Sequence, residues 1–111
     1  MPTIVADAGY ATFVNVFQVQ PEDQDTVVQI VIEINEEVAK AAPGFISAST
    51  HRSVDGTRVF NYLQWESKEH LAAVQRSEPF RERARRFAGM IEFTQYQCQI
   101  VYVGEREQGE S

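Results

Sequence analysis

The stretch at residues 58–66 carries the side chains with the clearest chemical potential, an asparagine and a tryptophan on an expected strand. Successive residues of a strand point to opposite faces, so Asn61 and Trp65 share one face, with Leu63 between them. An amide and an indole each need a hydrogen-bond partner when buried, and a plain core would use Val or Leu there. We therefore expect a ligand cavity lined by hydrogen-bond donors, among them Asn61 and Trp65.

The preceding strand supplies two further candidates. A two-residue turn at Asp55-Gly56 would set Thr50 opposite Asn61 and small residues opposite large ones, which leaves room for a ligand. The same register puts His51 on the opposite face of the sheet, and one β-bulge would bring it to the cavity. There it would be the natural base near neutral pH. The sequence leaves both positions of His51 open.

Each candidate also has a plain structural interpretation. A tryptophan at a strand end is commonly a packing anchor, and a strand asparagine is as often structural as functional. Both histidines, His51 and His70, could be surface or internally satisfied residues, and Tyr62 could line a wall or an interface. Most arginines of one short helix should be solvated, while one could face the cavity and hold an anion; these are Arg81, Arg83, Arg85 and Arg86.

The hydrophobic pattern predicts the elements that position these residues. β-branched and aromatic runs predict four strands, and apolar residues at spacings of three and four after Pro21 predict a helix. Ser67 and Ser77 are expected to cap two shorter helices. The predicted order is a strand at 11–19, a helix at 21–42, strands at 45–54 and 58–66, helices at 68–76 and 77–89, and a strand at 91–103.

This β-α-β-β-α-β order predicts an α+β fold, a ferredoxin-like split βαβ protomer with one antiparallel four-stranded sheet and helices on one face. The domain should span residues 11–103, between an N-terminal arm at 1–10 and a polar tail at 104–111. The uncovered face could carry Phe93, Gln95 and Gln97 of the last strand. Such a mixed face predicts a homodimer through stacked sheets, a dimeric α/β barrel.

Composition limits the possible classes of protein. A chain of 111 residues fits one domain, and its net charge of −6 argues against nucleic acid or an anionic membrane as a partner. Neither a membrane-spanning run nor a signal peptide is visible, so we expect a cytoplasmic protein. Two histidines and the single Cys98, expected to be a small buried hydrophobe, cannot close a zinc site alone. No nucleotide-binding loop is present, and we expect no metal and no cofactor.

Residues 43–67 resemble the antibiotic biosynthesis monooxygenase family. The resemblance rests on the Pro43-Gly44-Phe45 exit from the first helix, on the hairpin, and on a strand that ends in Gln64-Trp65-Glu66-Ser67. The combination of Asn61 and Trp65 with His51 looks like the anthrone oxygenases of aromatic polyketide pathways. The likeness covers residues 11–103.

This resemblance implies a cofactor-free monooxygenase that oxidises an anthrone-type aromatic polyketide intermediate to a quinone with O₂. It also implies a homodimer with joined sheets. The implied catalytic residues are Asn61, Trp65 and His51, and Arg85 would pair with a phenolate or carboxylate of the substrate. The other expected substrate-binding residues are Tyr62, Leu63 and Thr50.

Departures from the family pattern keep the substrate open. Leu71 stands where the anthrone oxygenases have a tyrosine, which bears on the substrate and the proton donor. Haem-degrading relatives need an axial histidine, which would fall near Ala84, and no histidine follows His70. Two alternatives remain: a polyketide-binding or cyclase module of the same dimeric fold without oxygen chemistry, and a general quinol monooxygenase.

Overall fold

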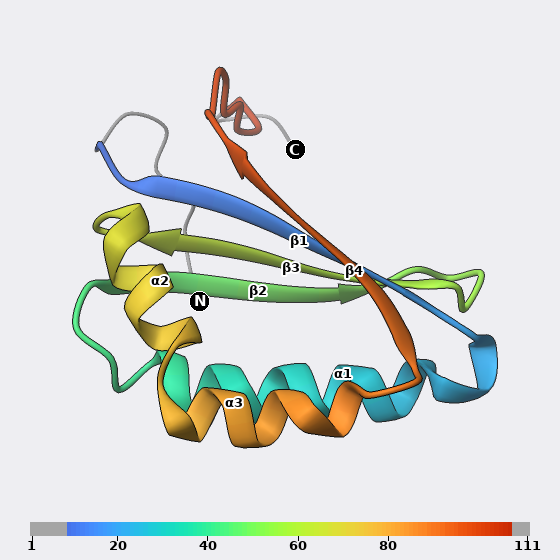
Figure 1. The fold of residues 1–111 in the computed structure, drawn as a ribbon. Helices are drawn as coiled ribbons and strands as arrows, with labels where there is room; N and C mark the ends of the chain where they lie inside the picture. Colours follow the sequence, from blue (N-terminus) through green and yellow to red (C-terminus); the bar gives the residue numbers. More distant parts are fainter. Residues whose placement is uncertain (1–8, 108–111) are drawn as a thin grey trace.

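The computed structural model describes residues 9–107, so most of the expected arm and the end of the expected tail lie outside the described residues. Its four strands form one antiparallel sheet in the order β2-β3-β1-β4, with the helices against one face (Figure 1). This confirms the predicted ferredoxin-like fold. The elements are β1 (Ala11–Val19), a 3₁₀ turn (Pro21–Asp23), α1 (Gln24–Ile34), a π-helical segment (Asn35–Ala39), β2 (Phe45–Arg52), β3 (Arg58–Trp65), α2 (Lys68–Gln75), α3 (Glu78–Ala84), a second 3₁₀ turn (Arg85–Phe87) and β4 (Ile91–Cys98).

The first helical region is less regular than the single helix expected from the sequence. Pro21 opens a 3₁₀ turn, because its fixed φ suits a first helical turn. α1 then buries one apolar stripe that includes Val27, Val31 and Ile34. Beyond it the chain widens into the π-helical segment, in which the backbone N–H of Lys40 donates to the carbonyl of Asn35 at 3.0 Å. Periodicity alone does not distinguish a π turn from the α-helix around it.

The exit from this helix packs tightly on α2. Gly44 has φ +86° and its carbonyl accepts a hydrogen bond from the backbone N–H of Glu66 at 2.7 Å. A Cβ at Gly44 would stand 2.3 Å from the ring of His70, so only glycine fits here. Ser67 caps α2 by accepting from the backbone N–H of His70, which confirms its predicted role. These contacts hold α2 at the end of β3 that carries Trp65.

The hydrophobic core has two parts. One is built around Phe17, Val31 and Phe87, and the other around Leu63 and Trp65. Both lie between the sheet and the helices, and Phe80 of α3 packs against each of them. The space between sheet and helical layer is therefore shared by two clusters, and the candidate site borders both.

β4 differs from the expectation in length and in the face that it presents. It ends at Cys98 because β1 begins at Ala11 and offers no partner further on. Phe93 pairs with Phe17 and Gln95 with Asn15, so these residues lie on the helix side and not on the uncovered face. Cys98 is exposed, so the expectation of a buried thiol is wrong. The last strand is an edge strand, and the helices leave most of it uncovered.

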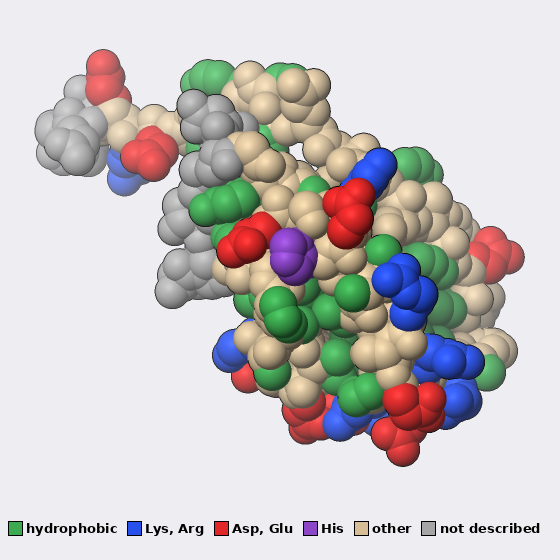
Figure 2. All heavy atoms as spheres, turned by 60° about the vertical axis from the view of Figure 1, so that its left-hand side comes forward, with side chains coloured by type: hydrophobic (Ala, Val, Ile, Leu, Met, Phe, Trp, Pro, Cys, Tyr) green, Lys and Arg blue, Asp and Glu red, His purple; other side chains and the backbone are tan. Residues whose placement is uncertain are grey.

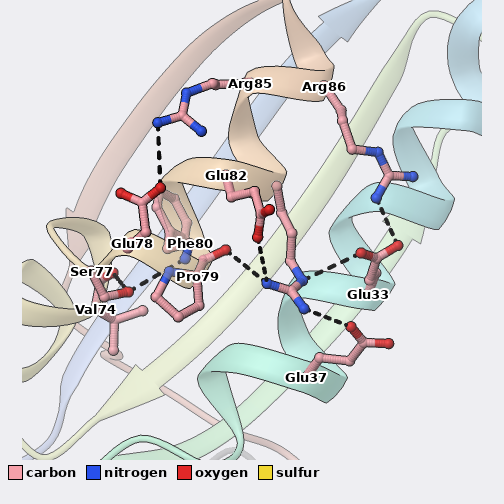
Figure 3. A network of polar contacts seen from close by, with 11 residues as sticks. Glu33, Glu37, Val74, Ser77, Glu78, Pro79, Phe80, Glu82, Arg85 and Arg86 are labelled. Carbon is pink, nitrogen blue, oxygen red and sulfur yellow. Dashed lines mark hydrogen bonds and ion pairs between the residues drawn. The ribbon is translucent and has the colours of Figure 1, made fainter.

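Ion pairs join α3 and the turn after it to α1 and to the π-helical segment. Arg83 contacts Glu33 at 3.3 Å and Glu37 at 2.9 Å, and Arg86 contacts Glu33 at 2.8 Å. Figure 3 shows Glu33 and Glu37 turned toward the segment that carries Arg86. The Arg86 and Arg83 guanidinium groups lower the pKa of Glu33. In Figure 2, charged side chains of both signs gather on this helical layer, in the lower part of the view.

The hairpin loop between β2 and β3 yields a pH prediction. Hydrogen bonds from Thr57 and Ser53 lower the pKa of Asp55 to about 2 from its usual 3.8. A carboxylate with a lowered pKa stabilises the fold above its unfolded pKa and loses that effect as the pH falls through the folded value. Asp55→Ala should therefore lower stability at pH 7, and the deficit should shrink between pH 4 and pH 2. Urea unfolding across this range measures it, with the exposed Glu105→Ala as control; a deficit that does not depend on pH would contradict the assignment.

Candidate active site

A cavity of about 410 Å³ lies between the sheet and the helices. Its walls are mostly apolar and include Phe17, Leu63, Leu71 and Phe87. The cavity is a size that suits a small organic ligand. Few polar side chains reach it, and they are Asn15, Asn35, Asn61, Trp65, Gln75 and Arg85.

Trp65 lies in this wall as the strand pattern predicts. Its side chain is fully buried, and its ring meets that of Phe45 edge-on with centroids 5.4 Å apart. The indole Nε1 has no hydrogen-bond partner among the described residues. Folded proteins rarely bury an N–H without a partner. The Trp65 N–H is therefore a donor in need of an acceptor, and a bound ligand can supply one.

Asn61 is held by two neighbours. Its Oδ1 accepts from Thr50 Oγ1 at 2.8 Å and from Asn35 Nδ2 at 3.1 Å, and its Nδ2 donates to Asn35 Oδ1 at 3.3 Å. A carbonyl oxygen has two lone pairs, and both are taken here. An amide nitrogen has two N–H groups, and the bond to Asn35 uses one. Toward a ligand, Asn61 therefore has a donor to offer and no acceptor.

Asn15 and Asn35 are site residues that the sequence prediction missed. Asn15 lies opposite Asn61 in the pairing of β1 with β3, and its buried Oδ1 has no partner among the described residues. Asn35 comes from the π-helical segment on the other side of the cavity. A signal was present, because each asparagine interrupts a stripe of apolar residues, as Asn61 does in β3.

The other predicted residues divide between the two faces of the sheet. Leu63 lines the cavity. Thr50 does not line it but donates a hydrogen bond to Asn61, which does. His51 and Tyr62 lie on the open face, with ring centroids 5.1 Å apart, and His51 Nε2 is 2.9 Å from Ser49 Oγ. The only irregularity in the pairing of β2 with β3 falls between Phe45 and Ser47, before His51, so it does not turn that side chain to the cavity.

Arg85 stands at the mouth of the cavity. Its side chain is 61% exposed, and its guanidinium lies 3.6 Å from the Glu78 carboxylate, a weak pairing that an anionic ligand could replace. In Figure 3, Arg85 and Arg86 leave the same segment in different directions, Arg85 toward Glu78. Arg85 is the only ionisable residue among the described residues that line the cavity. Leu71, which stands at the position of a family tyrosine, is buried in the same wall.

Residues 9–107 contain neither a cluster of metal-binding side chains nor a membrane-spanning helix. No three His, Cys, Asp or Glu side chains among them are grouped so that they could hold a metal ion. In the same residues, no helix is both long and apolar enough to cross a membrane.

The fold and the cavity define an α+β protein with a mostly apolar ligand site between its open sheet and its helices. Residues 11–86 match the family described as antibiotic biosynthesis monooxygenase. The chain belongs to this family. The match covers all three helices and the strands β1 to β3. It therefore includes β3, the strand that carries both Asn61 and Trp65.

Three individual proteins resemble this chain in sequence or in structure. Tetracenomycin-F1 monooxygenase of Streptomyces glaucescens is 39% identical over 74 residues, which cover 67% of this chain and 66% of that protein. An anthrone oxidase-like protein has a solved structure with a TM-score of 0.76 at 25% identity; the match covers 86% of this chain and 41% of that one. SnoaB, a cofactor-independent oxygenase from Streptomyces nogalater, shares the fold with a TM-score of 0.67 at 18% identity, over 93% of this chain and 100% of its own.

The amide pair makes a stability prediction. Asn61→Leu should cost about 1–3 kcal/mol of unfolding free energy, because it strands the buried Asn35 Oδ1 without a donor. Adding Asn35→Leu removes the group that Asn61→Leu leaves without a partner. The double variant should therefore lose less unfolding free energy than the two single variants lose together. Urea unfolding of the four proteins measures the coupling. Additive losses would show that the pair does not contribute as the distances indicate.

Proposed function

We propose that this chain is a cofactor-independent monooxygenase that oxidises an anthrone-type aromatic polyketide intermediate to a quinone with O₂. The observation that carries the proposal is a mostly apolar cavity lined by Asn61 and Trp65, each of which has an N–H that no hydrogen bond within the described residues uses. The similarity to tetracenomycin-F1 monooxygenase supports an aromatic polyketide as the substrate.

The cavity suits a planar fused-ring molecule. Aromatic and aliphatic side chains form most of its surface, including Phe17, Phe87 and Phe93. Aromatic rings gain from packing against such walls, and an enclosed site keeps reactive intermediates away from water. Arg85 at the mouth would meet a phenolate or carboxylate at the outer end of the ligand.

The chemistry asks little of the protein, because the substrate supplies the electrons. Loss of a proton from the anthrone methylene gives a carbanion that is delocalised into the ketone oxygen and two aryl rings. The N–H groups of Asn61 and Trp65 would stabilise the negative oxygen. A donor of this kind typically contributes about 3–4 kcal/mol in the transition state.

The reaction with oxygen then balances without a further reductant. The carbanion passes one electron to O₂, and the resulting carbon radical and superoxide join through a new C–O bond to form a peroxide after protonation. Loss of the second methylene proton and cleavage of the O–O bond release water and leave a carbonyl. One oxygen atom enters the quinone and the other becomes water.

The base for the first proton transfer is not obvious among the wall residues. His51, the base expected from the resemblance, lies on the open face of the sheet. The Arg85 guanidinium offers N–H donors and no acceptor. We therefore propose that the acidity of the substrate and a solvent molecule at the mouth provide this step, with the cavity favouring the anion.

Oxygen uptake tests the function directly. Purified protein should consume one O₂ per quinone formed from an anthrone such as dithranol, as followed with an oxygen electrode and by quinone absorbance. Asn61→Ala and Trp65→Phe should each lower kcat about 10²-fold, since each removes a donor to the oxyanion. Gln29→Ala, which removes an exposed amide from α1, is the matched control. Wild-type rates in both donor variants would end their assignment.

The same assay separates the alternatives. Tight binding of the anthrone without oxygen uptake would indicate a polyketide-binding or cyclase module. Faster turnover of simple hydroquinones than of fused-ring anthrones would indicate a general quinol monooxygenase.

We also propose that the protein is a homodimer joined through the open face of the sheet. Val14 and Val16 of β1 lie on this face beside Phe60, Tyr62 and Tyr96 of the neighbouring strands, and both tyrosines are exposed. A strip of exposed apolar side chains on an otherwise polar sheet face is typical of an interaction surface. Light scattering at micromolar concentration should give twice the protomer mass of 12.6 kDa. A monomer would exclude the dimer, and Tyr62→Asp with Tyr96→Asp should dissociate it.

A further inference from the structure

The amide of Asn61 forms hydrogen bonds with side chains from two elements that are distant from it in sequence. Asn35 comes from the π-helical segment and Thr50 from β2, and both reach Asn61 Oδ1. The three side chains also close a ring, because Asn35 Nδ2 lies 3.1 Å from Thr50 Oγ1. Asn35 and Asn61 are 8% and 5% exposed, so water competes little for these hydrogen bonds.

We propose that Asn35 and Thr50 are positioning residues that hold the Asn61 amide with its N–H, and not its carbonyl, available to a bound anion. The inference rests on the proposed role of Asn61 as an oxyanion donor. It adds the reason why this amide presents a donor, which its position on β3 does not explain.

The hydrogen bonds of the Asn61 amide explain why it presents a donor. In the observed arrangement both lone pairs of Asn61 Oδ1 are engaged, while one N–H of Nδ2 stays unused by the ring. Turning Asn61 alone would set its NH₂ against the NH₂ of Asn35, so the turn is opposed. If the whole ring reversed, Asn61 would donate to both neighbours and keep a free lone pair, which would repel an anion. The ring thus makes the two amides turn together, and a bound anion favours the observed arrangement, in which Asn61 presents an N–H.

The local backbone supports a specific role for Asn35. Its neighbours on the inner side of the helix, such as Val31 and Ile34, show that the space can be filled by apolar residues. Burying an amide there costs free energy unless its hydrogen bonds are made. The residue also begins a π-helical segment, a less stable geometry than the α-helix and one that is frequent at functional sites.

The test uses a dye that reports the anion and does not react with O₂. A hydroxyanthraquinone such as alizarin changes colour when its phenol ionises, so absorbance against pH gives its apparent pKa when bound. Wild-type protein should lower that pKa relative to free dye. Thr50→Val, which keeps the shape and removes the hydroxyl, and Asn35→Leu should each raise the bound pKa by about one unit, a tenfold change. In the anthrone assay kcat should fall about tenfold while KM changes little.

Controls separate positioning from general damage. Thr50→Ser keeps a hydroxyl and should restore the bound pKa, whereas Thr26→Val makes the same Thr-to-Val change at an exposed position of α1 and should leave it unaltered. If Asn35→Leu does not fold, Thr50→Val at its half-buried site carries the test. An unshifted dye pKa in Thr50→Val, or no binding or shift in wild-type protein, would overturn the inference. Wild-type protein that shifts the dye but consumes no O₂ with an anthrone would refute the proposed oxygenase while leaving the positioning role standing.

Discussion

The need of buried polar groups for hydrogen-bond partners governs the arrangement of this site. Asparagine and tryptophan side chains are set into a cavity whose other walls are mostly apolar, where each unmet donor or acceptor costs free energy. Asn61, Asn35 and Thr50 satisfy most of their needs among themselves. Trp65 Nε1 and Asn15 Oδ1 have no partner in the described chain. These unpaired donors and acceptors define which hydrogen-bonding groups a ligand must offer.

The fold supports this arrangement by keeping the two layers apart at one place. Two hydrophobic clusters fill the space between sheet and helices, and the cavity borders both. On the outer side of the helical layer, Glu33 of α1 forms ion pairs with Arg83 of α3 and with Arg86 of the turn after it. Because protein interiors are close-packed, a space of this size between sheet and helices indicates a ligand site.

The scarcity of ionisable groups in the wall is informative about chemistry. Many active sites depend on a base or nucleophile with an altered pKa. Here Arg85 alone among the described wall residues carries charge, and the rest are apolar or neutral polar groups. Such a site suits a substrate that itself supplies the electrons for the reaction. The protein then needs to provide only an apolar pocket and a few fixed hydrogen-bond donors. Membership of the antibiotic biosynthesis monooxygenase family agrees with chemistry of that kind.

Local patterns in the sequence determined a large part of this protein. Alternation along β3 identified the buried face with Asn61 and Trp65, the turn at Asp55-Gly56 fixed the pairing of Thr50 with Asn61, and the serine caps marked the helix starts. These features depend on residues close in sequence, which is why one strand or one turn suffices to predict them. Only the tertiary structure decided which distant groups meet. Asn35 reaches Asn61 across 26 positions, Phe93 turns to the cavity because β4 takes its register from β1, and His51 stays on the open face because no bulge adjoins it. Contacts of this kind depend on how the layers pack, and no local pattern specifies that packing.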